Sequence, residues 1–234
     1  MSAIELAGVH KRFGRVVAVE RVDLTIQRGQ FVGLIGHNGA GKSTCIGMIL
    51  GMLRPTEGAV RVCGVDVTAE PQRARAHLGA VPEAPAVFEY LSAREHLEFV
   101  AKVRGAQNLD EALEISGLGA AADRLIREYS QGMRRKAALA AALLGPPDVL
   151  VLDEALNGLD PPSAARVKGL LRRYVDDGGT VLLSTHVVET VQQVSDRVVM
   201  LAHGRVVADE RTADIGEQGL ERLFLERLQA TRDE

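Results

Sequence analysis

Gly36-His37-Asn38-Gly39-Ala40-Gly41-Lys42-Ser43-Thr44 follows the pattern G-x-x-x-x-G-K-[ST]. Glycines remove the side chains that would block a polyphosphate, and they permit the backbone angles that point successive N–H groups inward. In such a loop Lys42 reaches the outer phosphates, and the Ser43 hydroxyl is a ligand for Mg²⁺. The segment therefore predicts a site for a nucleoside triphosphate.

The residues on either side of this loop provide the context that the pattern requires. Residues 30–35 predict a buried strand, and residues 42–53 predict a helix that Arg54-Pro55 ends. The N-terminus of that helix carries the positive end of the helix dipole, so we expect it to face the phosphates.

The composition narrows the class of protein. The chain has 234 residues, a formal net charge of −3, 46% hydrophobic residues and 25% charged residues. These values are ordinary for a globular protein and give no electrostatic reason to expect nucleic-acid binding. Aromatic residues make up 3% of the chain, which also argues against base-stacking platforms.

We expect a soluble protein of a reducing compartment. Two cysteines, Cys45 and Cys63, make no disulfide framework. Residues 1–6 lack the basic and apolar regions of a signal peptide, and no apolar run approaches the roughly 18 residues of a membrane helix. Any membrane role would therefore come through a partner.

Strand and helix patterns alternate along the chain. Strands are predicted at residues 149–153 and 180–184, with hairpin strands within 4–35, 58–67 and 197–208. Helices are predicted at residues 91–103, 109–116, 131–144, 161–175 and 187–194, and a charged terminal helix at 212–234. This order is typical of an α/β protein whose parallel sheet has helices on both faces and is interrupted by a helical insertion.

A second acidic element follows the strand at 149–153. Its end carries Asp153-Glu154, and ligands bind at the carboxyl ends of strands in open α/β sheets. Asp153 would hold Mg²⁺ directly or through water, and Glu154 would polarise the water that attacks the γ-phosphate. The alternative is that the acidic pair only ends a strand. His186 ends a strand that should lie beside this one, so its ring would reach the γ-phosphate unless it is a structural or surface histidine.

Two further segments have both a structural and a functional interpretation. Ser130 is a natural N-cap for the helix predicted at 131–144, which is the structural interpretation. Gly132 leaves backbone N–H groups accessible at the same N-terminus, so the functional interpretation is an anion-binding site. Asp160 before Pro161 is likewise sufficient as an N-cap. The loop Ala155-Leu156-Asn157-Gly158-Leu159 before it leads from the acidic strand towards a possible partner subunit.

With these motifs in order, the chain resembles the ATPase subunits of ATP-binding cassette (ABC) transporters over essentially its full length. The phosphate loop, Asp153-Glu154, Asn157-Gly158-Leu159-Asp160 and Ser184-Thr185-His186 match that family in identity and order. The resemblance implies one cassette domain over residues 1–234. Residues from about 1–81 and 145–210 would form the P-loop NTPase core. This core would contain a mostly parallel sheet and an N-terminal antiparallel β subdomain. An α-helical subdomain would be inserted at residues 82–144, and a helical tail would follow at 211–234.

The resemblance also implies a complete site. Two cassettes, of the same chain, would pair head to tail, with Ser130 and Gly132 contacting the γ-phosphate in trans and Asp160 coupling the two sites. ATP and Mg²⁺ would be the cofactors. Phe13 matches the aromatic residue that stacks on adenine, and its alternative role is a core aromatic.

Two departures from the family pattern stand out. The family signature is Leu-Ser-Gly-Gly-Gln, and here Tyr129, Gln131 and Met133 replace three of its five residues. Glu83 stands where the family usually has Gln; its carboxylate would ligate Mg²⁺ but would also repel phosphate.

The leading hypothesis is an ATPase that powers transport, most resembling export, through separate membrane permease subunits. Such a protein would be cytoplasmic and peripheral on the inner face of the cell membrane. The alternative is a soluble ABC-type ATPase that acts on ribosomes or nucleic acid, although the chain has neither a second cassette nor long coiled coils. A GTPase is disfavoured because no Asn-Lys-x-Asp motif is present.

Overall fold

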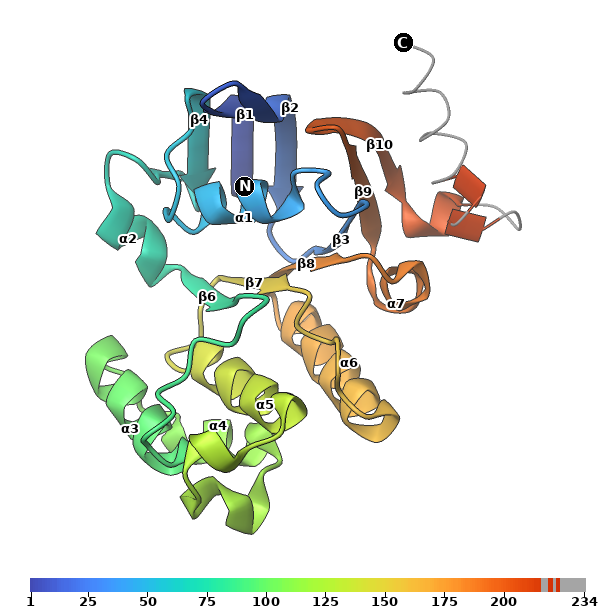
Figure 1. Ribbon diagram of the computed structural model, residues 1–234. Coiled ribbons are helices and arrows are strands. Elements are labelled where there is room, and N and C mark those ends of the chain that lie inside the picture. Colours follow the sequence, from blue (N-terminus) through green and yellow to red (C-terminus); the bar gives the residue numbers. More distant parts are fainter. Residues whose placement is uncertain (216–218, 221, 224–234) are drawn as a thin grey trace.

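The computed structural model describes residues 1–215, 219–220 and 222–223 and contains two sheets (Figure 1). The larger sheet has the strand order β10-β9-β3-β8-β7-β6. Its five strands from β9 to β6 are parallel, and β10 pairs antiparallel with β9. These strands are β3 (Phe31–Ile35), β6 (Leu78–Val81), β7 (Val149–Asp153), β8 (Thr180–Thr185), β9 (Arg197–Ala202) and β10 (Arg205–Arg211).

The smaller sheet is antiparallel and is built from the N-terminal part of the chain in the order β2-β1-β4-β5. Its strands are β1 (Ser2–Phe13), β2 (Val16–Gln27), β4 (Glu57–Val62) and β5 (Val65–Asp66). The predicted mostly parallel sheet and the antiparallel N-terminal sheet are therefore both confirmed.

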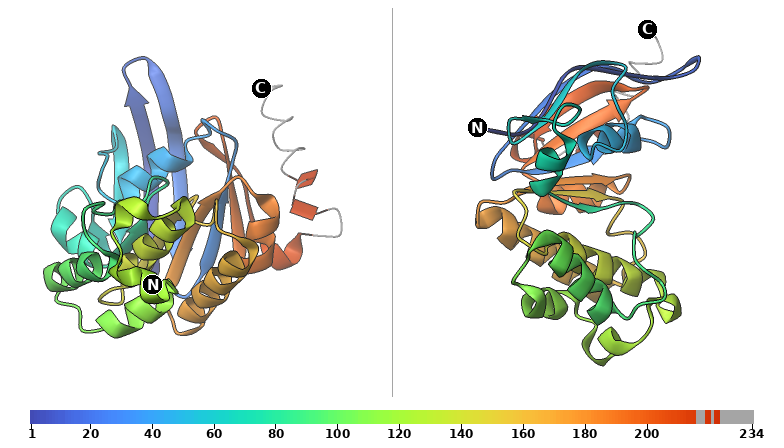
Figure 2. Two further views of the ribbon diagram at one scale, coloured as in Figure 1. Left: turned by 60° about the horizontal axis from the view of Figure 1, so that its bottom comes forward. Right: turned by 90° about the vertical axis from the view of Figure 1, so that its left-hand side faces the viewer.

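The α-helices fall into those that cover the large sheet and those of the helical segment. The first group is α1 (Lys42–Ile49), α2 (Pro71–Ala76), α6 (Pro161–Asp176) and α7 (Val188–Val194); the second is α3 (Ala93–Arg104), α4 (Leu109–Ser116) and α5 (Gln131–Ala142). Short 3-10 turns occur at Gly119–Asp123, Ile126–Glu128 and Thr212–Asp214. Figures 1 and 2 show α3, α4 and α5 grouped on the side of the large sheet that faces away from β1, β2 and β4. Within the described residues, no helix has both the length and the apolar character needed to cross a membrane.

Alternation along the strands divides the core between the two faces of the large sheet. Val32 and Leu34 of β3 pack with α1 and the antiparallel sheet. Phe31 of the same strand packs on the opposite face with residues of α5 and α6. Because the large sheet is buried on both faces, every residue of β3, β7 and β8 is buried, and β3 and β7 are apolar at nearly every position.

One predicted helix boundary needs correction, and two elements were missed. Helix α1 ends at Ile49 rather than at residue 53, because Gly51 adopts φ +66° and the Met52 and Leu53 N–H groups turn back to the Gly47 carbonyl. Helix α2 and strand β6 were not predicted as elements. Strand β10 ends at Arg211, and most of the predicted terminal helix lies outside the described residues. The division of the chain into domains at residues 81, 144 and 210 stays a prediction.

Parallel pairing places the carboxyl ends of β3, β8, β7 and β6 along one edge of the large sheet. The phosphate loop, His186 and Glu83 follow β3, β8 and β6, respectively, while Asp153 ends β7 and Glu154 follows it. The fold thus gathers at one edge residues that lie up to 150 positions apart in the sequence.

Candidate phosphate-binding site

The phosphate loop lies between β2 and the β9–β10 turn. The Gly204 N–H of that turn donates to the Ala40 carbonyl (2.9 Å). A Cβ atom at Gly41 would lie 2.6 Å from the Ala18 carbonyl of β2, and Gly41 has φ +105°. Only glycine fits this position, because any side chain would meet both a steric clash and an unfavourable backbone angle.

Helix α1 begins within the loop motif, at Lys42, and its N-cap residue Gly41 provides no side-chain cap. The N–H groups there point out of the helix and carry the positive end of its dipole. An anion placed against the loop would therefore meet backbone donors rather than side chains.

Lys42 lies inside the loop and is only 7% exposed. Its Nζ donates to the carbonyl oxygens of Gly36 (2.7 Å) and His37 (3.3 Å). Burial lowers the pKa of Lys42, while the negative charges of Glu154, Asp153 and Glu83 oppose that shift. The lysine is thus a buried cation that a negative ligand would stabilise.

A cavity of about 510 Å³ opens in front of the loop. It brings together several of the predicted site residues, namely Phe13, residues 37–44, Glu83 and Glu154. Phe13 is 47% exposed, which excludes the alternative that it is a buried core aromatic. Val16, Val17 and Ala18 of β2 line the same cavity beside it and were not predicted from the sequence.

Glu154 is held in place by its neighbours on both carboxylate oxygens. Oε1 lies 2.9 Å from His186 Nδ1, and Oε2 accepts from Asn157 Nδ2 (2.8 Å). The residue is 8% exposed and adopts φ +49°, a conformation that costs a non-glycine residue about 1–3 kcal/mol. Its N–H donates to the Ser184 carbonyl of β8 (2.9 Å). The backbone strain and the two side-chain partners together fix the carboxylate at the cavity.

His186 lies beside the acidic strand, as the sequence predicted, since Asp153 of β7 is paired with Ser184 of β8. Asn157 was missed by the sequence analysis as a site residue. Its position three residues after Glu154 was the available signal, because the turn there folds the amide back to the carboxylate.

Asp153 has the chemistry of a cation ligand. Its side chain is buried at 6% exposure, and Oδ1 has no hydrogen-bond partner among the described residues. A buried carboxylate oxygen without a partner is costly unless a cation or donor approaches it. Ser43, at the start of α1, and Glu83 line the cavity as further oxygen donors.

Ser130, Gly132 and Asp160 do not line this cavity. Ser130 caps α5 by accepting from the Met133 N–H (3.3 Å), and Asp160 caps α6 by accepting from the Ser163 N–H (2.9 Å). A Cβ at Gly132 would lie 3.2 Å from the Gly158 carbonyl, so the start of α5 packs against the loop that leads to Asp160. These residues form a second, separate group, in which Ser130 and Asp160 are exposed.

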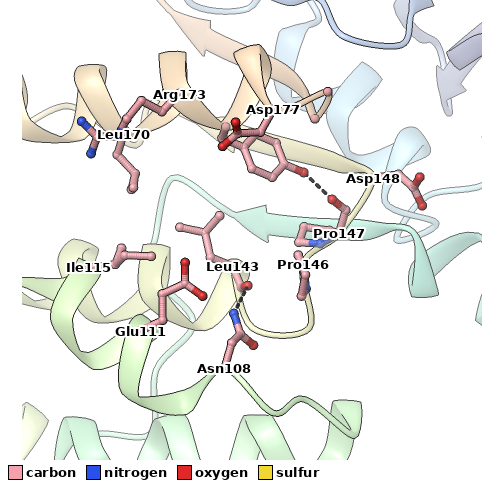
Figure 3. Close-up of a pocket in the computed structure, with 13 residues that line it drawn as sticks. Asn108, Glu111, Ile115, Leu143, Pro146, Pro147, Asp148, Leu170, Arg173 and Asp177 are labelled. Carbon is pink, nitrogen blue, oxygen red and sulfur yellow. Dashed lines mark hydrogen bonds between the residues drawn. The ribbon is translucent and has the colours of Figure 1, made fainter.

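A cleft of about 530 Å³ lies elsewhere, between α4, the end of α5 and α6 (Figure 3). Asn108, Glu111, Arg173 and Asp177 are among its polar lining residues, and Asn108 Nδ2 donates to the Leu143 carbonyl (3.2 Å). It contains neither a glycine-rich phosphate cradle nor any of the predicted site residues. Chemistry rather than size therefore identifies the cavity at the phosphate loop as the functional site.

A lysine inside a glycine loop, facing an acidic strand end across a nucleotide-sized cavity, defines the class of P-loop nucleotide-binding proteins. A family model described as ABC transporter matches residues 19–157, which is more than half of the chain. The chain belongs to the ABC transporter family, as one of its ATP-binding ATPase subunits.

Individual relatives agree with this assignment. The chain is 40% identical over 219 residues to the daunorubicin/doxorubicin resistance ATP-binding protein DrrA of Streptomyces peucetius, covering 91% of this chain and 66% of that protein. It is 37% identical over 215 residues to the Nod factor export ATP-binding protein I of Sinorhizobium fredii, covering 89% and 63%, respectively. The chain thus spans about two thirds of the length of these relatives.

Solved structures match over a larger share of their own length. The structure of an ATP-binding subunit of an ABC transporter superposes with a TM-score of 0.89 at 29% identity, covering 97% of this chain and 99% of that one. A second is a dimeric post-hydrolysis state of an ATP-binding cassette bound to ADP and Pi. Its TM-score is 0.83 at 26% identity, and the match covers 89% and 98% of the two chains.

Proposed function

We propose that this chain binds and hydrolyses ATP as one half of a head-to-tail cassette dimer, and that the dimer drives export through a separate membrane permease. The observation that carries the proposal is the Glu154 carboxylate, held by His186 and Asn157 at the cavity that contains Lys42. A fixed carboxylate beside a phosphate cradle suits the activation of water rather than simple binding.

ATP binding is assigned to the loop and to Phe13. The N–H groups of residues 36–44 and the start of α1 would surround the phosphates. Lys42 would exchange its two carbonyl partners for phosphate oxygens, which relieves the cost of its burial. The exposed ring of Phe13 lies 4.9 Å from Lys11 Nζ and offers a face for the adenine.

Mg²⁺ is assigned to Ser43, Asp153 and Glu83. The donors are all oxygens, the type that Mg²⁺ prefers, and the unpartnered Oδ1 of Asp153 fits a cation. When bound, the ion would supply charge neutralisation at the phosphates.

Hydrolysis is assigned to Glu154 with His186. The carboxylate would orient and polarise the attacking water, and the His186 ring beside Oε1 would hold the carboxylate towards the γ-phosphate. Asn157 donates to the other oxygen and so restricts rotation of the same group.

The remaining site residues are assigned to the partner subunit's site. Ser130, Gly132 and Asp160 gather outside the cavity of their own chain, and a related cassette is solved as a dimer. A second copy of this chain would therefore bring Ser130 and Gly132 to the γ-phosphate, while Asp160 links the two sites.

The permease is assigned to the helical segment. Phe88, Tyr90, Phe99 and Val103 expose 48–78% of their surface there, and a cavity of about 230 Å³ lies nearby between β6, α3 and α5. Exposed aromatic clusters of this kind mark protein interaction sites.

The export direction rests on relatives such as the Nod factor export protein, and it implies a cytoplasmic subunit on the inner face of the membrane.

Replacement of Glu154 by Gln tests the proposal. We expect ATP binding to persist while hydrolysis falls by at least about a hundredfold, since phosphoryl transfer depends on positioned charges. The variant should form an ATP-dependent dimer in size-exclusion chromatography, and a tagged form should retain a membrane protein from detergent extracts.

Glu98→Gln, an exposed carboxylate of α3, is the matched control and should keep the wild-type rate. Hydrolysis by Glu154→Gln at the wild-type rate would exclude the catalytic assignment.

A further inference from the structure

Three side chains of metal-binding type meet far from the phosphate loop. Cys63 lies in the turn between β4 and β5, His77 ends α2, and Asp148 directly precedes β7. Their ligand atoms all lie within 4.8 Å of one another, and the three residues are half-buried. His77 Nδ1 lies 2.6 Å from Asp148 Oδ2.

We propose that Cys63, His77 and Asp148 form a Zn²⁺ site. Thiolate, imidazole and carboxylate together are a typical zinc ligand set, and three protein ligands leave a fourth position for water. Mg²⁺ and Ca²⁺ prefer oxygen ligands only, so this set disfavours both. The site lies at the opposite end of β7 from Asp153 and does not rest on the proposed ATPase function.

The observed spacing requires only small movements. Tetrahedral zinc bonds of 2.0–2.3 Å place neighbouring ligand atoms about 3.3–3.8 Å apart. The 2.6 Å hydrogen bond between His77 and Asp148 would open slightly as zinc replaces its proton, and the longest separation would close by about 1 Å. Side-chain rotations of half-buried residues suffice for both changes.

The backbone at Cys63 is a second observation that points to its side chain. Cys63 has φ +49° and Gly64 has φ +81°, a two-residue hairpin turn that favours Asn, Asp or Gly at its first position. Cysteine gains nothing from this conformation, yet the turn brings its sulfur to His77 and Asp148 rather than out into solvent.

The positively charged side chain of Arg28 lies beside Cys63, His77 and Asp148. Its Nη1 donates to Asp148 Oδ1 (3.0 Å), on the carboxylate oxygen that does not face His77. Burial and the negative charge of Asp148 raise the pKa of the Cys63 thiol, while the charge of Arg28 and a hydrogen bond from its side chain oppose that shift. With zinc bound, Arg28 would leave the sulfur and keep Oδ1, orienting the carboxylate as outer partners of metal ligands do.

The position of the site suggests what the metal does. Cys63 belongs to the antiparallel sheet, whereas His77 and Asp148 adjoin β6 and β7 of the large sheet. Asp148 also lines the cleft of Figure 3, where its side chain points away from Asn108 and Glu111. Zinc would therefore link the two sheets and raise the thermal stability of the nucleotide-free protein.

Metal titration of the full chain tests the proposal. Zinc-stripped protein without nucleotide is titrated with Zn²⁺ against a chromophoric chelator, and separately with Co²⁺ to detect a thiolate-to-cobalt charge-transfer band. We expect one equivalent of zinc, a raised melting temperature and a cobalt band.

Cys63→Gly is the decisive variant because glycine suits φ +49° better than cysteine and keeps the turn intact. It should lower zinc affinity by about tenfold or more and lose the cobalt band, while Asp148→Asn weakens binding but keeps the band. Cys45→Ala, at the buried cysteine of α1, should retain both. Absence of stoichiometric zinc uptake by the wild type, or a cobalt band that survives Cys63→Gly, would overturn the proposal.

Discussion

At the scale of single residues, Lys42 combines burial with charge. Only 7% of the residue is exposed, and burial lowers its pKa despite three nearby carboxylates. The folded protein therefore holds this proton less tightly than the unfolded chain does. Between the lowered pKa and the ordinary one, the Lys42 position of the unfolded chain binds more protons, so the contribution of Lys42 to the free energy of unfolding rises with pH through that window.

Lys42→Met should remove this contribution and the phosphate contact together. We expect the free energy of unfolding of the wild type to rise relative to that of the variant as the pH increases through this window, as measured by denaturant titrations at several alkaline pH values without nucleotide. ATP hydrolysis should fall by about a hundredfold or more, because a charge aimed at the reacting phosphate is lost.

Lys102→Met, at an exposed position of α3, is the control for removing one lysine charge. An identical pH dependence in wild type and Lys42→Met would contradict the assignment of the alkaline rise to Lys42.

At the scale of elements, two N-cap serines allow helix capping to be separated from a role in ATP hydrolysis. Ser92 and Ser130 cap α3 and α5, each accepting from the N–H three residues on, at 3.2 and 3.3 Å, and Ser92 in addition forms a capping box with Glu95. Ser→Ala at either position should cost about 1 kcal/mol of stability. Only Ser130→Ala should also reduce ATP hydrolysis by the isolated protein, by about tenfold or more, because only this serine is assigned to the partner's γ-phosphate.

Thermal unfolding and steady-state hydrolysis of both variants give the comparison. Equal effects of the two substitutions on hydrolysis would show that Ser130 is a cap and nothing more.

Elements were predictable from the sequence where their patterns were long or sharply bounded. Strand β7 agrees with the prediction to the residue, because its apolar run lies between Pro146-Pro147 and the acidic pair. Helix α2 and strand β6 were missed because they have six and four residues, too few for a periodic pattern. In β6 the absence of a side chain at Gly79 has a packing reason, since a Cβ there would lie 2.2 Å from the Ala142 carbonyl of α5.

The candidate site was predictable as a set of residues but not as a geometry. Sequence motifs identified Lys42, Glu154 and His186, and the parallel order of β3, β8 and β7 brings their segments to one edge. The contacts on Glu154 depend on its positive φ and on the turn that returns Asn157; the spacing of three residues was a signal for the second contact, but no local pattern specifies the positive φ. The separation of Ser130 and Asp160 from the cavity likewise follows only from the packing of α5 and α6.

At the scale of the whole molecule, the split of the site residues into two groups predicts complementation between defective chains. Lys42→Met removes a residue of the cavity, and Ser130→Ala removes one assigned to the partner's cavity. In a head-to-tail dimer of one chain of each kind, one site carries both defects and the other carries neither.

A 1:1 mixture of the two variants should therefore hydrolyse ATP faster than the average of the separate variants at the same total concentration. If subunits exchange freely and the sites act independently, half of the dimers are mixed and each has one intact site, so recovery approaches about a quarter of the wild-type rate. Mixing Lys42→Met with Glu154→Gln is the matched control, because both defects lie in the same chain's cavity and each site of the mixed dimer keeps one of them. Activity in the control mixture equal to that in the test mixture would place Ser130 in its own chain's site and contradict the head-to-tail arrangement.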